Sequence, residues 1–100
     1  MTQQKPPSFD AIVLHDTDNV ATALHYLERG TDVKIKAPAR DLVIKVCDCI
    51  PACHKFSLQA LEIGFYVRKH GMSIGFATTA IDQGAHVHIH NLIGRDPQDR

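Results

Sequence analysis

The sequence lacks an excess of charge of either sign, and it lacks a long apolar run. Its 100 residues carry 11 basic and 11 acidic side chains, so no surplus of Lys and Arg is available for nucleic-acid phosphates or an anionic membrane. No apolar run approaches the roughly 20 residues of a membrane-spanning helix. Because 44% of the residues are hydrophobic and the net charge is zero, intrinsic disorder is also excluded. We expect one small domain that binds neither nucleic acid nor membrane.

Cysteine is scarce, and its placement is poor for disulfides. Cys47, Cys49 and Cys53 are an odd number of thiols close together in the chain, so we expect them to be reduced. Residues 1–10 are polar, contain two prolines and have no apolar core of a signal peptide. Both features predict a cytoplasmic protein. Histidine is the residue in excess, with seven copies.

Alternation with a period of two dominates the middle of the chain and predicts a mostly β domain. The strands that we expect cover residues 9–15, 32–36, 42–46 and 85–92. One helix is predicted between residues 16–18 and Gly30, because Val20, Leu24 and Leu27 have helical spacing. Asp16, Thr17 or Asp18 would cap this helix, and Gly30 would end it. Residues 1–8 and 94–100 are expected to be flexible tails around a domain of residues 9–93.

A weak internal repeat adds detail to this fold. Three segments, residues 27–33, 61–67 and 81–87, each have an apolar residue, a glycine three positions later and a valine after three more. The pattern predicts a short helical turn that ends at a glycine with positive φ, followed by the start of a strand. Ordinary turn chemistry is the alternative.

The segment His86-Val87-His88-Ile89-His90 is the most distinctive chemical feature. On a strand the three imidazoles share one face, with neighbours about 6.8 Å apart at Cα. Two of them can share a metal ion, but His86 and His90 would lie about 13.6 Å apart, so a site needs groups from elsewhere. The alternatives are a polar face at a cleft or subunit junction and a solvated surface rich in histidine.

Two further clusters could carry chemistry. His15 follows the first strand, and Asp16 or Asp18 could hold its imidazole for acid–base work, although capping also explains the aspartates. Cys47, Cys49, Cys53 and His54 could bind zinc, but their spacing matches no common zinc pattern. Lys55 could bind a substrate carboxylate as a point charge or could be an ordinary solvated lysine.

Together these segments resemble the SAF domain of the altronate and galactarate dehydratase family, over residues 9–93. The resemblance is carried by His15-Asp16-Thr17-Asp18-Asn19-Val20-Ala21, Ile50-Pro51, His54-Lys55, Gly71, Ile74-Gly75, Ala77-Thr78 and Gly84-Ala85-His86-Val87-His88-Ile89-His90-Asn91. It implies a β-clip fold and a lyase that removes water, or sulfite in a related sulfo-lyase, from a sugar acid or 2-hydroxy acid. It also implies a divalent metal, expected to be iron. In that family the domain is the N-terminal part of a long dehydratase or a separate small subunit, and a chain ending at Arg100 would be the small subunit.

The site expected on these grounds has three parts. The catalytic residues are His15, Asp18 and His54, the substrate-binding residues are Asn19, Lys55 and Asn91, and the metal ligands are His86, His88 and His90. A large dehydratase subunit would complete the site, and a homo-oligomer is possible. The alternatives are a module that binds a sugar acid or anion without chemistry, a sulfolactate sulfo-lyase subunit, and a metal-handling or structural protein. One departure from the family is Cys53, where glycine is common; if that position has positive φ, cysteine costs about 1–2 kcal/mol.

Overall fold

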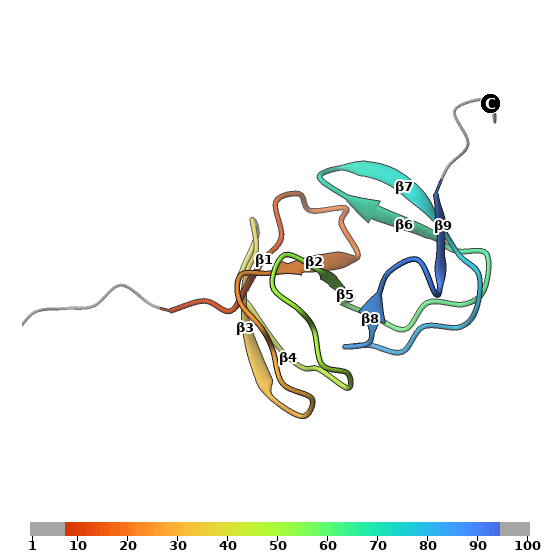
Figure 1. Cartoon of the computed structure of the whole chain (residues 1–100). Helices are drawn as coiled ribbons and strands as arrows, with labels where there is room; N and C mark the ends of the chain where they lie inside the picture. Colours follow the sequence, from red (N-terminus) through yellow and green to blue (C-terminus); the bar gives the residue numbers. More distant parts are fainter. Residues whose placement is uncertain (1–7, 95–100) are drawn as a thin grey trace, which may run out of the picture.

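The computed structural model describes residues 8–94, which form nine short strands joined by turns (Figure 1). The strands are β1 (Ala11–Ile12), β2 (Val20–Ala23), β3 (Asp32–Lys36), β4 (Leu42–Lys45), β5 (Lys55–Ser57), β6 (Tyr66–Lys69), β7 (Met72–Ala77), β8 (His86–Val87) and β9 (Leu92–Gly94). The mostly β prediction is confirmed. Of the two predicted tails, residues 1–7 and 95–100 lie outside the described residues.

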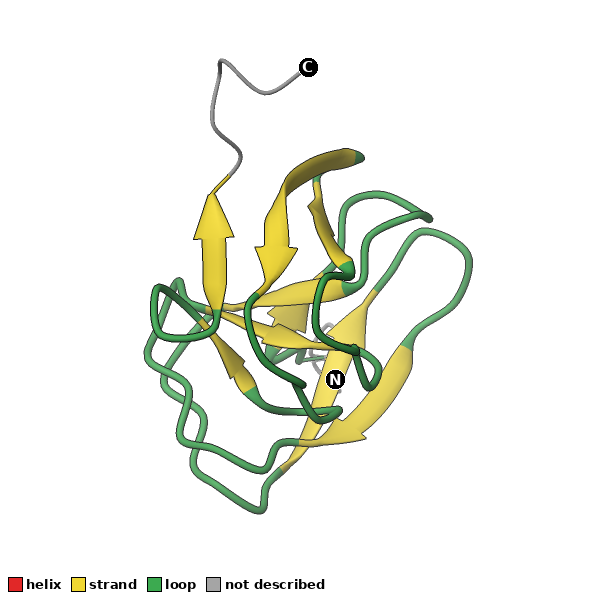
Figure 2. Ribbon diagram, turned by 90° about the vertical axis from the view of Figure 1, so that its right-hand side faces the viewer, coloured by secondary structure: helices red, strands yellow, loops and turns green. Residues whose placement is uncertain are grey.

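Figure 2 shows strands and loops, and no helix, in the part of the chain that the structure describes. The prediction of a helix between residues 16–18 and Gly30 is therefore wrong. The segment Val20–Ala23 is β2, which pairs with β1 on one edge and with β5 on the other. Two backbone ladders and the burial of Ala21 outweigh the helical spacing of a few apolar residues. Among residues 8–94, accordingly, no helix is long and apolar enough to cross a membrane.

The strands form two sheets. The larger has the order β4-β3-β1-β2-β5-β8, and the smaller has the order β6-β7-β9. The strand predicted at residues 32–36 is confirmed, and its Val33 and Ile35 are fully buried as the alternation requires. The strand predicted at 42–46 is β4, shorter by one residue, whereas only Ala11–Ile12 of the segment 9–15 is paired.

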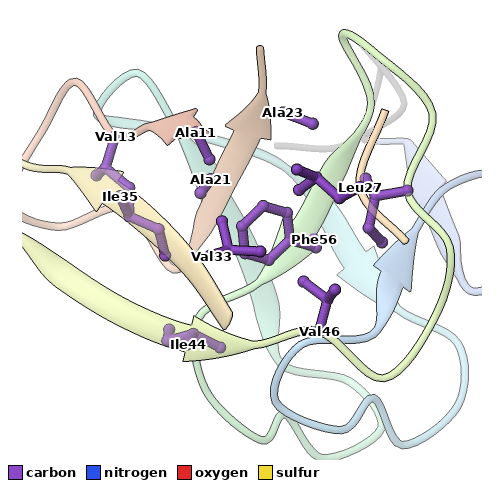
Figure 3. Packing of buried hydrophobic residues seen from close by; sticks show 11 residues of the cluster. Ala11, Val13, Ala21, Ala23, Leu27, Val33, Ile35, Ile44, Val46 and Phe56 are labelled. Atoms are coloured by element: carbon purple, nitrogen blue, oxygen red, sulfur yellow. The ribbon is translucent and has the colours of Figure 1, made fainter. Parts of the chain in front are cut away.

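Two clusters of apolar side chains stabilise these sheets. The larger surrounds Phe56 and includes Leu27, Val33 and Val46 (Figure 3). The smaller cluster includes Val20, Leu61 and Val87 and contains side chains from strands of both sheets. Val20 and Ala21 are adjacent in β2 but belong to different clusters, because successive side chains of a strand point to opposite faces. The strand β2 therefore lies between the two halves of the core.

The internal repeat corresponds to a recurring turn. The glycines Gly30, Gly64 and Gly84 have φ of 87°, 88° and 84°, and a strand begins two residues after each. The positive φ and the strand starts are confirmed, but the segments are hydrogen-bonded turns rather than helical ones. Their first apolar residues pair across the molecule, since Leu61 bridges Ile81 and Leu27 bridges Ile50.

The structure contains a fourth copy of this turn, which begins at Ile50 and which the sequence pattern did not reveal. Ile50 is followed three residues later by Cys53 and after three more by the buried Phe56. The N–H of Cys53 donates to the carbonyl of Ala23 at 2.9 Å, as the N–H of Gly30 donates to that of Val46 at 2.8 Å. Cys53 takes the place of the glycine, and its φ is 70°.

Replacing Cys53 with glycine is expected to stabilise the fold by about 1 kcal/mol, because glycine adopts positive φ without the strain of a Cβ atom. The midpoint of urea unfolding should rise with no change in its slope. Cys49→Gly serves as the control, since Cys49 is an exposed thiol without positive φ, and this variant should be less stable than the wild type. A loss of stability in Cys53→Gly would show that the thiol itself is needed.

Candidate functional site

Three histidines from two segments meet beside the edge of the larger sheet. The strand predicted over residues 85–92 ends at Val87, and the chain then turns and begins β9 at Leu92. Asn91 holds this turn: its Nδ2 donates to the carbonyl of His86 at 2.9 Å, and its Oδ1 accepts the N–H of His88 at 3.0 Å. Asn91 was predicted to bind substrate, but both ends of its buried amide bond the backbone of the histidine segment.

His54 supplies the third imidazole. It directly precedes β5, which pairs with β8 so that Phe56 lies opposite His86. A hydrogen bond of 2.9 Å joins His54 Nδ1 to His86 Nε2, and the rings of His54 and His88 stack with centroids 4.6 Å apart. We call His54, His86 and His88 the imidazole cluster. One ligand nitrogen from each lies within 4.8 Å of the others.

His90 does not belong to this cluster, although it was predicted as a ligand beside His86 and His88. Its ring lies against that of His86 with centroids 5.4 Å apart, tilted by 32°. The group that could hold a metal contains His54 in its place. Within residues 8–94 the three exposed, unpaired cysteines do not join that group either, so the zinc alternative based on them gains no support.

The environment of two members of the imidazole cluster, His86 and His88, favours their neutral form. Partial burial, followed by the proximity of His54, His90 and His88, lowers the pKa of His86. The pKa of His88 is also lowered, by desolvation first and then by His54 and Lys55. Neutral imidazoles have a lone pair free for a metal. A set of three imidazole nitrogens without a carboxylate suits zinc or iron better than magnesium or calcium.

Asp48 supports the cluster, and sequence reasoning missed it. Its carboxylate oxygen accepts the N–H of His86 at 2.9 Å, and its negative charge acts on the ring of the same residue. The contact connects the loop after β4 to β8. An acidic residue between Cys47 and Cys49 gives no signal of this role, since the two segments lie far apart in the chain.

Lys55 follows His54 and is half-buried. Desolvation, with a smaller contribution from Lys69, lowers the pKa of its amine. Within the described part of the chain, the carboxylates that form ion pairs are Asp10 and Asp32, and neither pairs with Lys55. A half-buried ammonium with a second cation nearby favours a negatively charged ligand.

Asp18 and Asn19 are committed to the backbone of the smaller sheet. The two carboxylate oxygens of Asp18 accept the N–H groups of His70 and Gly71 at 2.9 and 2.8 Å, at the turn between β6 and β7. Asn19 accepts the N–H of Arg68 and donates to the carbonyl of Tyr66. These bonds give Asp18 and Asn19 a structural role. From the sequence, Asp18 was predicted to be catalytic and Asn19 to bind substrate.

His15, also predicted to be catalytic, is not part of the imidazole cluster. Its Nδ1 lies 2.9 Å from the hydroxyl of Thr17, and its ring lies beside Gly71. The prediction that the histidines of the opening and closing segments form one site therefore gains no support, because the structure separates them into two groups.

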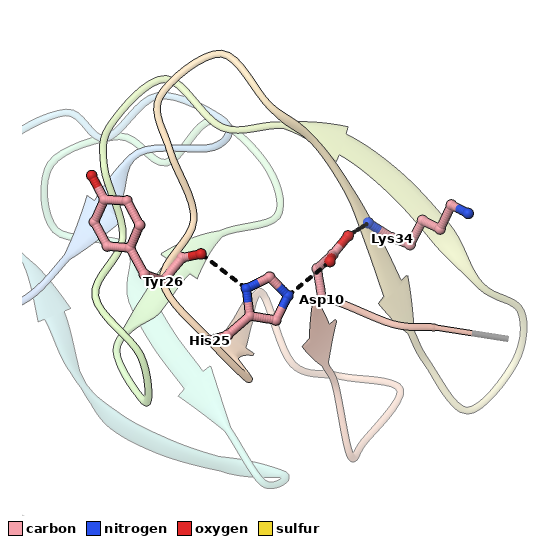
Figure 4. A network of polar contacts seen from close by, with 4 residues as sticks. All are labelled: Asp10, His25, Tyr26 and Lys34. Carbon is pink, nitrogen blue, oxygen red and sulfur yellow. Dashed lines mark hydrogen bonds and ion pairs between the residues drawn. The ribbon is translucent and has the colours of Figure 1, made fainter. Parts of the chain in front are cut away.

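A further histidine, His25, forms a polar network with Asp10 (Figure 4). One ring nitrogen lies 2.9 Å from the carbonyl of Tyr26 and the other 2.9 Å from a carboxylate oxygen of Asp10. These two acceptors raise the pKa of His25, the carbonyl of Tyr26 more than Asp10. The other oxygen of Asp10 accepts the N–H of Lys34, the main reason that the pKa of Asp10 is lowered.

His25→Gln is expected to lose stability in acid but not in base. The folded state raises the pKa of His25, so its contribution is fully present below the unfolded value of about 6.5 and is lost as pH rises through the folded pKa. Urea unfolding of the two proteins from pH 5 to 9 measures this difference. It should be largest at pH 5 and vanish at pH 9, whereas a difference independent of pH would contradict the network.

Together the fold and the site define a small all-β domain with a cluster of imidazoles and a half-buried lysine beside one sheet. The family model described as the altronate/galactarate dehydratase SAF domain matches residues 9–95, and the chain belongs to this family. The resemblance noted from the sequence is confirmed.

Three relatives place this domain in larger systems. Altronate dehydratase of Escherichia coli strain K12 is 38% identical over 80 residues, and that of Bacillus subtilis strain 168 is 35% identical. Each alignment covers 80% of this chain but only 15% of the relative's length. The (2R)-sulfolactate sulfo-lyase subunit alpha of Chromohalobacter salexigens is 32% identical over 84 residues, which cover 80% of this chain and 89% of that subunit.

Proposed function

We propose that this chain is the small subunit of a metal-dependent sugar-acid dehydratase and works with a larger catalytic polypeptide. The observation that carries the proposal is the imidazole cluster in a domain of this family. The relatives support the class of reaction, since those named altronate dehydratase contain the domain as a small part of their length.

The imidazole cluster fits a divalent metal such as iron. His54, His86 and His88 would hold the ion, which would act as a Lewis acid that polarises a substrate oxygen. The burial and mutual proximity that lower the pKa of His86 keep its nitrogen available near neutral pH. Asp48 orients the segment that carries His86 through the backbone N–H.

Lys55 would bind the carboxylate of the sugar acid beside this cluster. Dehydration by β-elimination breaks the C–H bond next to the carboxylate and the C–O bond of the neighbouring hydroxyl, which leaves as water after it takes up a proton. A cation at the carboxylate stabilises the negative charge that develops there when the proton is removed. Lys55 supplies this charge without a competing ion pair within residues 8–94.

A row of exposed apolar side chains on the smaller sheet supports the proposal that the chain binds a partner polypeptide. Tyr66 lies opposite Phe76, which lies opposite Ile93, so the three side chains cross β6, β7 and β9 in register. They are 56%, 38% and 49% exposed. Contiguous apolar surface of this kind marks protein contacts. We propose that the larger polypeptide covers this row.

The test is an assay of dehydration with the chain, with a larger dehydratase chain of the family, and with both. Altronate and galactarate are the substrates, and the readout is the 2-oxo-3-deoxy acid formed. We expect turnover only when both chains are present. Turnover should be lost in Lys55→Met and in Phe76→Glu. The Phe76→Glu chain should lose activity because it no longer binds the larger chain, and the two should then not co-elute in size-exclusion chromatography. Lys34→Met is the control, since Lys34 is an exposed lysine of β3. Full activity of the larger chain alone would refute the proposal.

A second candidate is a subunit of a sulfo-lyase. The observation that favours it is that the chain aligns with 89% of the sulfolactate sulfo-lyase subunit alpha. The same three mixtures should then release sulfite from (2R)-sulfolactate. Sulfite release without dehydration of either sugar acid would select this candidate, and dehydration without sulfite release would exclude it.

A further inference from the structure

The outer edge of β4 has no partner strand within residues 8–94. β4 is the first strand of the larger sheet and pairs there with β3 alone. Figure 1 shows it on the side of the molecule away from β6, β7 and β9, which carry the row of Tyr66, Phe76 and Ile93. An edge of this kind presents N–H and C=O groups that can pair with another strand.

The backbone groups of Val43 point outward from this edge. Val43 lies opposite Lys34 in β3. The N–H of Lys34 donates to the carboxylate of Asp10 at 3.0 Å, and its carbonyl accepts the N–H of Asp10 at 2.8 Å. Both groups of Lys34 therefore point away from β4, so Lys34 and Val43 form a pair without mutual hydrogen bonds. Alternation along the chain gives Asp41 and Lys45 the same outward direction as Val43.

The segment at this edge is complementary to its own reverse. It reads Asp41-Leu42-Val43-Ile44-Lys45. In an antiparallel pair of two copies centred on Val43, Asp41 of each copy lies opposite Lys45 of the other, and Leu42 lies opposite Ile44. Opposite charges and apolar side chains that face each other across two strands stabilise a sheet. The three outward residues are also those that exchange N–H···O bonds in this register.

Both charges are available for this contact. Asp41 is exposed and forms no ion pair within residues 8–94. Lys45 Nζ lies 3.1 Å from a carboxylate oxygen of Asp32, and the two side chains are 64% and 67% exposed. In the paired arrangement Lys45 would lie between Asp32 of its own chain and Asp41 of the second copy. A lysine on an edge strand usually prevents pairing, but this one selects a register, since any shift moves it away from Asp41.

The exposed face beside this edge offers apolar surface. Val43 is 66% exposed. Together with Phe9, Lys34 and Leu42 it lines a cavity of about 270 Å³. A second copy paired at β4 would bring its own Val43 alongside, so the apolar surfaces of the two copies would become continuous. Contiguous apolar surface favours a protein contact.

We propose that β4 pairs with β4 of a second copy of this chain, in the antiparallel register that sets Val43 opposite Val43. The contact is isologous and joins the larger sheets of two copies into one. It leaves the imidazole cluster uncovered, because β5 and β8 lie at the other edge of the larger sheet. The paired segment is short, so we expect a reversible dimer with a dissociation constant on the order of 10–100 µM.

The test is analytical ultracentrifugation of the metal-free full chain from about 5 to 500 µM, with a reductant because the three cysteines are exposed. We expect the mass to rise reversibly from monomer to dimer. Asp41→Lys and Lys45→Asp should each weaken the dimer about tenfold or more, since each sets like charges opposite each other at both ends of the contact. Glu62→Lys is the matched control, because Glu62 is exposed and precedes β6 in the smaller sheet.

An equimolar mixture of the Asp41→Lys and Lys45→Asp chains tests the register. Each variant alone repels a second copy of itself, but a mixed dimer has opposite charges at both ends of the contact. The mixture should therefore dimerise nearly as well as the wild type. Val43→Pro removes an N–H that the monomer does not use, so it should abolish the dimer, and its amide spectrum should show a folded chain.

Amide exchange measured by NMR identifies what covers the edge. The N–H of Val43 should exchange more slowly as the concentration of the chain rises. Protection independent of concentration would mean that another segment of the same chain covers β4, and it would overturn the proposal. A chain that is monomeric at about 500 µM, or a mixture of the two charge variants that does not associate, would overturn it as well. No readout here includes turnover or the larger polypeptide, so failure leaves the dehydratase proposal intact.

Discussion

Replacing His86 with alanine is expected to weaken binding of Zn²⁺ or Fe²⁺ more than about 100-fold, the upper range for loss of an outer partner of a metal ligand. The wild-type chain should bind one ion. His86 is central to the imidazole cluster, since it is hydrogen-bonded to His54 and stacked on His88. Competition with a chromophoric chelator under anaerobic conditions measures the affinity.

The matched control is His90→Ala, which removes an imidazole 5.4 Å from His86 but outside the cluster. This variant should bind metal nearly as well as the wild type. His54→Ala should bind metal as weakly as His86→Ala does. Equal losses in His90→Ala and His86→Ala would restore the ligand set predicted from the sequence. A wild-type chain that binds no metal, with or without the larger polypeptide, would remove the metal from the proposed function.

The same cluster has a defined response to acid. Because the folded state lowers the pKa of His86 and His88, protons compete with a metal only below the ordinary histidine value of about 6.5. Without metal, the unfolded chain takes up these protons more readily than the folded chain, so His86 and His88 make the fold less stable as pH falls below that value. The effect is opposite in sign to that of His25, whose pKa is raised.

Local patterns predicted the strands best where one face is buried. Alternation at residues 32–36 identified β3 and the buried Val33 and Ile35. Alternation failed at residues 85–92, because the amide of Asn91 folds the chain back after Val87. The prediction of a helix failed for a related reason, since β2 pairs on both edges and its ladder with β5 connects residues far apart in sequence.

The imidazole cluster could be predicted only in part. Strand geometry indicated that a metal site on this segment needs a group from elsewhere, and the structure places His54 beside His86 and His88. That this group is His54 depends on the pairing of β5 with β8, which no local pattern reveals. The positive φ at Cys53 was a conditional expectation from the family, and the structure confirms it at 70°.

Polar residues of the opening motif show why such motifs are hard to interpret. An aspartate near a histidine suggests acid–base chemistry, but the same carboxylate is also a good acceptor for backbone N–H groups. Asp18 accepts two such bonds, from the N–H groups of His70 and Gly71, which lie 52 and 53 residues further along the chain. His15 lies beside that turn and its Nδ1 contacts Thr17, so the motif positions an imidazole through a distant hairpin as well as through a neighbouring residue.

Asp18→Asn is therefore expected to lower the free energy of unfolding by about 1.5–3 kcal/mol, the range for a hydrogen bond to a charged group. An amide offers one acceptor oxygen, so it leaves the N–H of His70 or Gly71 facing an NH₂ group. Asp18 is 9% exposed, and little water is available to replace the lost bond. Urea unfolding at pH 7 measures the change.

Asp16→Asn is the control for Asp18→Asn, because Asp16 is an exposed neighbour of the same charge, and its stability should change by less than about 0.5 kcal/mol. The ring signals of His15 should shift in Asp18→Asn, since the turn that contacts this ring loses a bond. If Asp18→Asn were as stable as the wild type but inactive with the larger polypeptide, the carboxylate would act on substrate, and the structural role given to it by its two hydrogen bonds would be wrong.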